Sequence, residues 1–128
     1  MRVSKFKGKD KAGNWHFGDV LHHDHGIVVI VDDAGKQHTI IPQTRCEFTG
    51  FKDIDGKEIF EGDILLINEL TKENSNNFKA VVFYGNGTFY AKYINLKGCM
   101  DTSSNVPLYM VLKFSNSVKV IGNIHDNE

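Results

Sequence analysis

The sequence has only two cysteines and two prolines among its 128 residues. Two cysteines are too few for a disulfide scaffold or a Cys-rich zinc domain, and a chain of this length buries enough apolar surface to fold without either. No charge of one sign dominates, because 15 lysine and arginine residues stand against 16 aspartate and glutamate residues. This balance argues against a strongly basic surface of the kind that binds nucleic acid.

Long hydrophobic runs are also missing. The longest unbroken apolar run, IVVIV at 27–31, is far shorter than the roughly 20 residues that a membrane-spanning helix needs. The opening segment, MRVSKFKGKD, has no apolar core, so we expect no signal peptide. These absences predict a cytoplasmic protein that is not membrane-bound, in which Cys46 and Cys99 remain reduced.

Glycine, by contrast, is abundant and divides the chain into short segments. Twelve glycines separate stretches rich in β-branched and aromatic residues, which favours strands over helices. Two hairpins are predicted, at 26–41 and at 78–94, the second around an Asn-Gly turn. Further strands are predicted at 106–114 and 117–124, whereas the polar, asparagine-rich segment 68–78 is predicted to be a mobile loop that could contain one helical turn.

The predicted fold is therefore all-β, with two small units that could also form one compact domain. Residues 1–45 form the N-terminal β unit, and residues 46–128 form a C-terminal unit that we expect to be SH3-like and barrel-like. The predicted core consists of apolar residues on these strands: Val28, Ile30, Ile59, Ile64, Leu66, Val82, Phe89, Val111, Val118, Val120 and Ile124.

One sequence pattern occurs twice. Residues 9–21 read Lys-Asp-x-x-Gly, then a segment containing an aromatic residue, then Gly-Asp-Val-Leu, and residues 52–65 repeat this pattern with isoleucine in place of valine. The aspartate can bond the backbone two residues further on and the glycine can adopt the left-handed conformation, so each copy predicts a tight turn. The repeat indicates either an old duplication or two β units that reuse the same turn residues by chance.

The second copy, together with the end of the sequence, resembles the YopX family of phage and prophage proteins. The resemblance lies in FTGFKDIDGKEIFEGD at 48–63 and in VIGNIHDN at 120–127. The signature residues are Thr49, Gly50, Asp53, Gly56, Ile59, Phe60, Glu61, Gly62, Asp63, Gly122 and Asn123. The resemblance implies a β-rich fold and a phage or prophage gene in a bacterial host cell. It supplies no established catalytic or ligand-binding residues.

A histidine cluster, HHDH at 22–25, is the most conspicuous group of possible metal ligands. Imidazole binds zinc well, and in an extended segment His23 and His25 would share one face while His22 would lie on the other. No second pair of ligands accompanies the cluster, so an exposed polar tip between two strands is the alternative interpretation. We therefore predict no metal and no other cofactor.

The sequence contains no recognisable catalytic pattern. Neither cysteine has a visible base beside it, and no glycine-rich phosphate-binding motif is present. The paired carboxylates Asp53 and Asp55 lie in a predicted turn, where a structural role explains them better than acid–base chemistry. We therefore predict that the protein is not an enzyme.

Two binding functions remain. The preferred hypothesis is a non-enzymatic phage accessory module that binds an unknown protein partner or assembles into a homo-oligomer, because edge strands readily pair with another chain. The alternative is a small β-barrel that binds single-stranded nucleic acid, with aromatic side chains stacking on bases and lysines contacting phosphates. The candidate contacts for this alternative are Lys5, Lys7, Tyr90, Lys92 and Tyr93.

Overall fold

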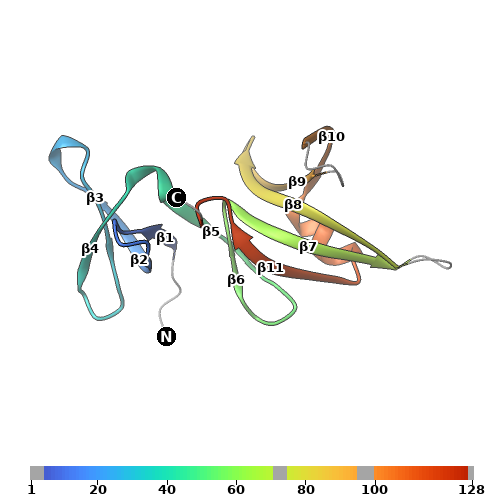
Figure 1. Ribbon diagram of the computed structural model, residues 1–128, viewed down its shortest axis with the longest axis horizontal. Helices are drawn as coiled ribbons and strands as arrows, with labels where there is room; N and C mark the ends of the chain where they lie inside the picture. The colour runs from blue at the N-terminus through green and yellow to red at the C-terminus, as the bar shows by residue number, and fades with distance from the viewer. Residues whose placement is uncertain (1–4, 71–74, 95–99, 127–128) are drawn as a thin grey trace. The chain divides into compact units, whose positions relative to one another are not determined.

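The computed structural model describes residues 5–70, 75–94 and 100–126 (Figure 1). Most of these residues are in strands, so the prediction of a mainly β protein is confirmed. The strands are β1 Phe6–Lys9, β2 Trp15–His22, β3 Val28–Val31, β4 Gln37–Ile40, β5 Cys46–Lys52, β6 Glu58–Phe60, β7 Asp63–Leu70, β8 Ser75–Gly85, β9 Thr88–Ile94, β10 Met100–Pro107 and β11 Ser117–Asn123. The helical elements are the single 3-10 turns η1 Asp24–Gly26 and η2 Pro42–Thr44 and the α-helix α1 Leu108–Phe114. No described helix is long and apolar enough to cross a membrane.

The chain is divided into two units. The first contains residues 5–48 together with the tail residues 125 and 126, and the second is Thr49–Ile124. The sequence-based division instead placed the boundary between 45 and 46 and kept the tail with the second unit. The tail returns to the first unit after the second has been completed.

The first unit is a curved antiparallel sheet with the strand order β4-β3-β2-β1-β5. β3 and β4 form the hairpin predicted at 26–41. After β4, the backbone N–H of Ile41 donates to the carbonyl oxygen of Lys9 in β1 at 2.7 Å, which brings the β4 side of the sheet back to β1. Gly8 permits this curvature, because a Cβ at that position would collide with the side chain of Ile40. Val28, Ile30 and Ile40 fill the interior.

The second unit is an antiparallel sheet with the strand order β10-β9-β8-β7-β11, and β6 pairs beside β5. The hairpin of β8 and β9 is the one predicted at 78–94, with Asn86 and Gly87 at positive φ in its turn. β11 confirms the strand predicted at 117–124. No pairing joins β10 to β11 within the described residues, so the sheet is open and the description "barrel-like" applies only loosely.

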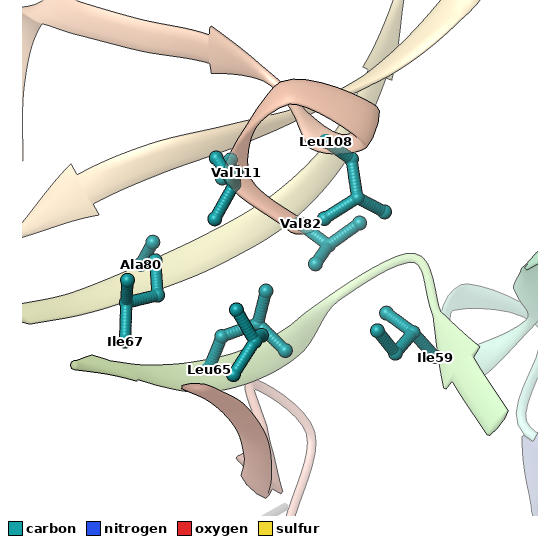
Figure 2. Close-up of a cluster of buried hydrophobic side chains, with 9 residues drawn as sticks. Ile59, Leu65, Ile67, Ala80, Val82, Leu108 and Val111 are labelled. Atoms are coloured by element: carbon teal, nitrogen blue, oxygen red, sulfur yellow. The ribbon is translucent and has the colours of Figure 1, made fainter. Parts of the chain in front are cut away.

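The main hydrophobic core lies on one face of this second sheet (Figure 2). Figure 2 shows Leu108 and Val111 extending from α1 toward Val82, with Leu65 on β7 across the core from them. The buried members are Ile59, Leu65, Ile67, Ala80, Val82, Ala91, Leu108, Val111 and Val118. Full burial of a valine or leucine side chain contributes about 1.5–3 kcal/mol. This core therefore holds β6 and α1 on the same face of the sheet.

The prediction of a strand at 106–114 is wrong from Leu108 onward, where the chain forms α1. Leu108 and Val111, three residues apart, face the core, whereas Tyr109 and Phe114 are exposed. This is helical periodicity, and leucine, methionine and lysine are strong helix formers. A short apolar run does not by itself distinguish a strand from a helix, which explains the error.

The prediction of a loop at 68–78 is also wrong at both ends of the segment, because β7 continues to Leu70 and β8 begins at Ser75. Residues 71–74 lie outside the described part of the chain. The polar composition of the segment favours a loop, but the cross-strand pair Asn68 and Asn77 belongs to the ladder between β7 and β8.

The predicted core is one residue out of register on β7. Leu65 and Ile67 are fully buried, whereas Ile64 and Leu66 lie on the opposite face and are partly exposed. Successive side chains of a strand point to opposite faces, so a slip of one position exchanges the two faces. Ile124 was also placed in the core wrongly, since it is 50% exposed beyond the end of β11. The predicted residues that do lie in or against the two cores are Val28, Ile30, Ile59, Val82, Phe89, Val111, Val118 and Val120.

Candidate functional site

The face of the second sheet opposite the core is a partly exposed apolar surface. Ile64 and Leu66 alternate with the buried core residues of β7, and the same alternation continues on β8 and β9. α1 and β6 cover the core face, whereas the side chains on this opposite face keep part of their surface in solvent. We call it the outer face; its apolar members are Ile64, Leu66, Val81, Phe83, Tyr90 and Ile94.

Three lysines stand among the apolar residues of the outer face. Lys79 and Lys119 lie directly opposite Leu66, one on each side of β7, and Lys92 lies opposite Val81. Directly opposite residues on antiparallel strands share a face and are close neighbours. The described outward positions of β7, β8, β9 and β11 include no aspartate or glutamate. The outer face is therefore locally positive, although the chain has a net charge of −1.

The residues proposed for nucleic-acid contact are divided between different surfaces. Tyr90 and Lys92 lie on the outer face, whereas Lys5 is an exposed residue of the first unit. Tyr93 points to the core side, and its hydroxyl donates to the Glu69 carboxylate at 3.5 Å. Burial raises the pKa of Tyr93 to about 12, and the negative charge of Glu69 acts in the same direction. Only Tyr90 and Lys92 of this set are brought together on the outer face.

The fifth nucleic-acid candidate, Lys7, is buried in a cradle that holds the tail in the first unit. Lys9 is only 3% exposed, and its ammonium group donates to the carbonyl oxygens of His125 at 2.6 Å and Asp126 at 3.1 Å. Trp15 donates from Nε1 to the carboxylate of Asp126, and the ammonium group of Lys7 lies 4.7 Å from the centre of the Trp15 ring. Lys7 is thus placed among structural contacts, where it is poorly accessible to a phosphate.

The candidate metal ligands do not form a metal site in the described structure. His22 ends β2 and contacts the guanidinium group of Arg45, a cation that opposes the binding of a second cation. His23 and His25 are exposed, and His25 has a left-handed φ of 65° within η1. Among the described residues, no three histidine, cysteine, aspartate or glutamate side chains are placed to hold one ion.

Three tight turns share one Asp-x-x-Gly design; two of them belong to the repeated sequence pattern, and the third is the turn of the hairpin predicted at 26–41. They begin at Asp10, Asp32 and Asp53. In each turn the aspartate Oδ1 accepts the backbone N–H groups of the residues two and four positions further on, at 2.9–3.0 Å. The glycine three positions after the aspartate has a φ of 82–89°. These turns are Asx-type structures that close hairpins.

The second carboxylate oxygen binds a histidine in the first two turns and a backbone N–H in the third. Nε2 of His16 donates to Asp10 and Nε2 of His38 donates to Asp32, both at 2.8 Å. The two imidazole rings stack with their centres 3.9 Å apart and an interplanar angle of 12°. Asp53 instead accepts the backbone N–H of Val120 at 2.9 Å. The first two turns are thus tied to each other through stacked histidines.

The Asp10 turn predicts a measurable acid titration. The hydrogen bond from His16 lowers the pKa of Asp10 from 3.8 to about 2. Because the folded-state pKa is below the unfolded value, the stability that Asp10 contributes is present above about pH 4 and lost as the pH falls toward 2. Carbon-detected NMR of the side-chain carboxyl should give a midpoint near 2, and His16→Ala should raise it. His25→Ala, which changes an exposed histidine, should leave it unchanged; a wild-type midpoint near 3.8 would contradict the prediction.

A buried corner joins the two sequence segments that carry the family resemblance. Asp63 is fully buried, and its carboxylate accepts the backbone N–H of Phe60 at 2.7 Å and the side-chain amide of Asn123 at 2.9 Å. Gly62, with a φ of 84°, donates its N–H to Val82 and accepts the N–H of Ile124. The end of β11 is thereby fixed to the connection between β6 and β7.

The signature turn at Asp53 covers the edge of β11 that does not pair with β7. Asp53 accepts the N–H of Val120, and the backbone N–H of Ile54 donates to the carbonyl oxygen of Val118 at 3.0 Å. Thr49 supports this turn, because its hydroxyl donates to the carbonyl oxygen of Ile59 at 2.8 Å. A pocket of about 220 Å³ lies beside the turn, but the Asp53 carboxylate in its wall is occupied by backbone N–H groups.

Comparison with known proteins identifies the family of this chain. The sequence matches the profile of the family described as YopX protein over residues 5–128. The chain belongs to the YopX family. The resemblance seen at 48–63 and 120–127 is therefore confirmed, and it extends over nearly the whole chain. No curated protein matches the sequence.

A solved structure shares the fold of this YopX family member. The crystal structure of protein EF1440 from Enterococcus faecalis matches with a TM-score of 0.56 and a sequence identity of 22%. The match covers 99% of this chain and 96% of that chain. At this level of identity the likeness shows a common fold and nothing about activity.

In this YopX family protein the signature residues build the fold of the second unit. Asp63 and Asn123 bond within the corner, and Asp53 and Thr49 bond around the turn. The remaining members are the glycines of turns and bends, the buried residues of β6, and one partly exposed acid: Gly50, Gly56, Gly62 and Gly122, Ile59 and Phe60, and Glu61. The signature therefore marks structural positions, and the outer face lies largely outside it.

Proposed function

We propose that this YopX family protein is a non-enzymatic, phage-encoded accessory module that binds a protein partner through the outer face. The observation that supports this proposal is the row of partly exposed apolar side chains on a sheet face opposite the packed core. An apolar centre with a polar rim is the usual anatomy of a protein-binding surface. The signature carboxylates Asp53 and Asp63 bond to backbone and amide groups, and this supports binding over catalysis.

The aromatic pair on the outer face favours a protein partner over single-stranded nucleic acid. The rings of Phe83 and Tyr90, which are opposite each other, stack with their centres 5.3 Å apart and an interplanar angle of 19°. Side chains on a strand stand roughly perpendicular to the sheet, so these rings cover part of each other's faces. Bases bind by stacking on free ring faces, whereas a protein surface can pack against ring edges and aliphatic groups alike.

The charges on the outer face favour a different chain over a second copy of this one. A symmetric dimer uses the same patch on both subunits. Such a dimer would bring the Lys79, Lys92 and Lys119 cluster of one copy toward the same cluster of the other. Like charges placed together in an interface oppose association.

The proposal predicts that removing the aromatic pair abolishes partner binding without unfolding the protein. Immobilised wild-type protein and a Phe83→Ser, Tyr90→Ser variant would be incubated with lysate of phage-infected bacteria, with and without nuclease treatment, and the retained proteins compared by quantitative mass spectrometry. We expect the variant to retain the specific partner about tenfold less, because interface aromatic residues carry much of the binding energy.

The matched control is Phe114→Ser, which removes an aromatic ring that is 72% exposed on α1 and not on the outer face. It should retain the partner as the wild type does, and circular dichroism should show that both variants are folded. Equal loss in the control and in the aromatic-pair variant, or retention that disappears on nuclease treatment, would contradict the proposed function.

A further inference from the structure

The outer face also contains information about the chemistry of its partner. Lys79, Lys92 and Lys119 lie on three strands, β8, β9 and β11, and each stands beside an aliphatic side chain of a neighbouring strand. Lys79 and Lys119 are exposed and Lys92 is partly exposed. The ammonium groups are thus distributed across the apolar surface, so a partner that covers the apolar side chains also comes within reach of the lysines.

No negative charge on the described part of the outer face compensates these lysines. The outward neighbours on β7, β8 and β11 are apolar, or are amides and hydroxyls such as Asn68, Asn77 and Ser117. Glu69 is the carboxylate nearest in sequence to the centre of β7. It lies on the other side of the sheet, where it accepts a hydrogen bond from the hydroxyl of Tyr93. A partner without anionic groups would cover three lysines without pairing them, at a cost in desolvation.

We infer that the partner is an acidic protein surface, in which aspartate or glutamate side chains surround apolar or aromatic residues. This inference rests on the proposed function and names the partner class for the same outer face. Carboxylates would pair with Lys79, Lys92 and Lys119, while the apolar residues of the partner would pack on Ile64, Leu66, Val81 and the aromatic pair. Complementary charge of this kind selects partners and accelerates association.

Defined polymers test the inference without knowledge of the natural partner. Fluorescence anisotropy would measure the binding of the protein to a labelled random copolymer of glutamate and tyrosine, to polyglutamate, and to an oligo-dT of about 20 nucleotides. We expect the copolymer to bind about tenfold more tightly than polyglutamate, because only the copolymer offers rings to the apolar centre. Binding should weaken as salt rises.

Substitutions connect this binding to the outer face. Neutralising the three lysines, with Lys79→Gln, Lys92→Gln and Lys119→Gln, should weaken copolymer binding about tenfold at low salt. The matched control neutralises three exposed lysines outside the outer face, with Lys11→Gln, Lys36→Gln and Lys113→Gln, and should bind as the wild type does. Unfolding midpoints would show that both triple variants are folded.

The possible outcomes separate this inference from the proposed function. Copolymer binding that depends on the three outer-face lysines supports the inference. Absence of copolymer binding, an equal effect of the control triple variant, or tighter binding of oligo-dT than of the copolymer overturns it. The proposed function is judged separately, by whether the aromatic-pair variant loses its partner from nuclease-treated lysate, so the partner class can fail while the binding function stands.

Discussion

Asp63→Ala should lower the free energy of unfolding by about 3–5 kcal/mol. Asp63 is fully buried and accepts hydrogen bonds from the backbone of Phe60 and the side chain of Asn123. Alanine would leave both donors buried without this acceptor, and an unsatisfied buried donor loses its hydration as well as its bond. The corner that connects β6 and β7 to the end of β11 would be lost with it.

Urea unfolding followed by circular dichroism would measure this loss. The matched control is Asp55→Ala, an exposed carboxylate of the neighbouring signature turn, whose removal should change stability by no more than about 0.5 kcal/mol. Adding Asn123→Ala to Asp63→Ala should cost little more than Asp63→Ala alone, because the two residues act through one hydrogen bond. If the two substitutions lowered the free energy of unfolding additively, the hydrogen bond between Asp63 and Asn123 would not be the cause of the destabilisation.

Ending the chain at Ile124 should destabilise the first unit by about 2–4 kcal/mol. The truncation removes the carbonyl oxygens of His125 and Asp126, which receive the buried ammonium group of Lys9. A buried lysine that loses hydrogen-bond acceptors retains the cost of its desolvation. The fluorescence of Trp15, the single tryptophan of the chain, should report the change directly, because its indole N–H donates to Asp126.

A second variant distinguishes the role of Lys9 from a general effect of shortening the chain. In a Lys9→Met background there is no buried ammonium group, so the same truncation should cost only about 1 kcal/mol. In a Lys11→Met background, where the substituted lysine is exposed, the truncation should keep its full effect. Equal costs in the two backgrounds would refute the role assigned to Lys9.

The parts of the fold that the sequence predicts well are those set by local chemistry. Glycine marks the hairpins of β3 with β4 and of β8 with β9, with Asp32 three positions before Gly35 in the first and Asn86 beside Gly87 in the second, because few other residues adopt the left-handed turn conformation. The Asp-x-x-Gly turns at Asp10 and Asp53 are visible for the same reason. The family resemblance is equally local, since it depends on two short segments.

Errors arose where two local interpretations have nearly the same pattern. The run Ile64, Leu65, Leu66, Ile67 is apolar at every position, so alternation cannot say which pair faces the core. The packing of α1 on one face of the sheet determines that Leu65 and Ile67 face the core, but the sequence pattern predicts a strand where α1 lies. The reversed register predicts Ile64 and Leu66 to be core residues, so the sequence does not reveal the outer face, and only Tyr90 and Lys92 among its members are candidate contacts.

The tail cradle lies beyond what a single sequence can reveal. Lys9 and Trp15 near one end of the chain meet His125 and Asp126 near the other, and no pattern within either segment identifies the other. The nearest signal was the segment VIGNIHDN, which indicated that the tail matters without indicating its contacts. The burial of Lys7 could not be predicted for the same reason, because burial cannot be read from a basic stretch of sequence.

The return of the tail to the first unit has a consequence for biosynthesis. Thr49–Ile124, with its own core, lies in the sequence between Lys9 and the two residues whose carbonyl groups Lys9 binds. Because residues 125 and 126 closely follow β11 in the sequence, they leave the ribosomal exit tunnel almost together with it. The first unit therefore cannot be complete before the second, although its strands β1 to β4 are translated earlier.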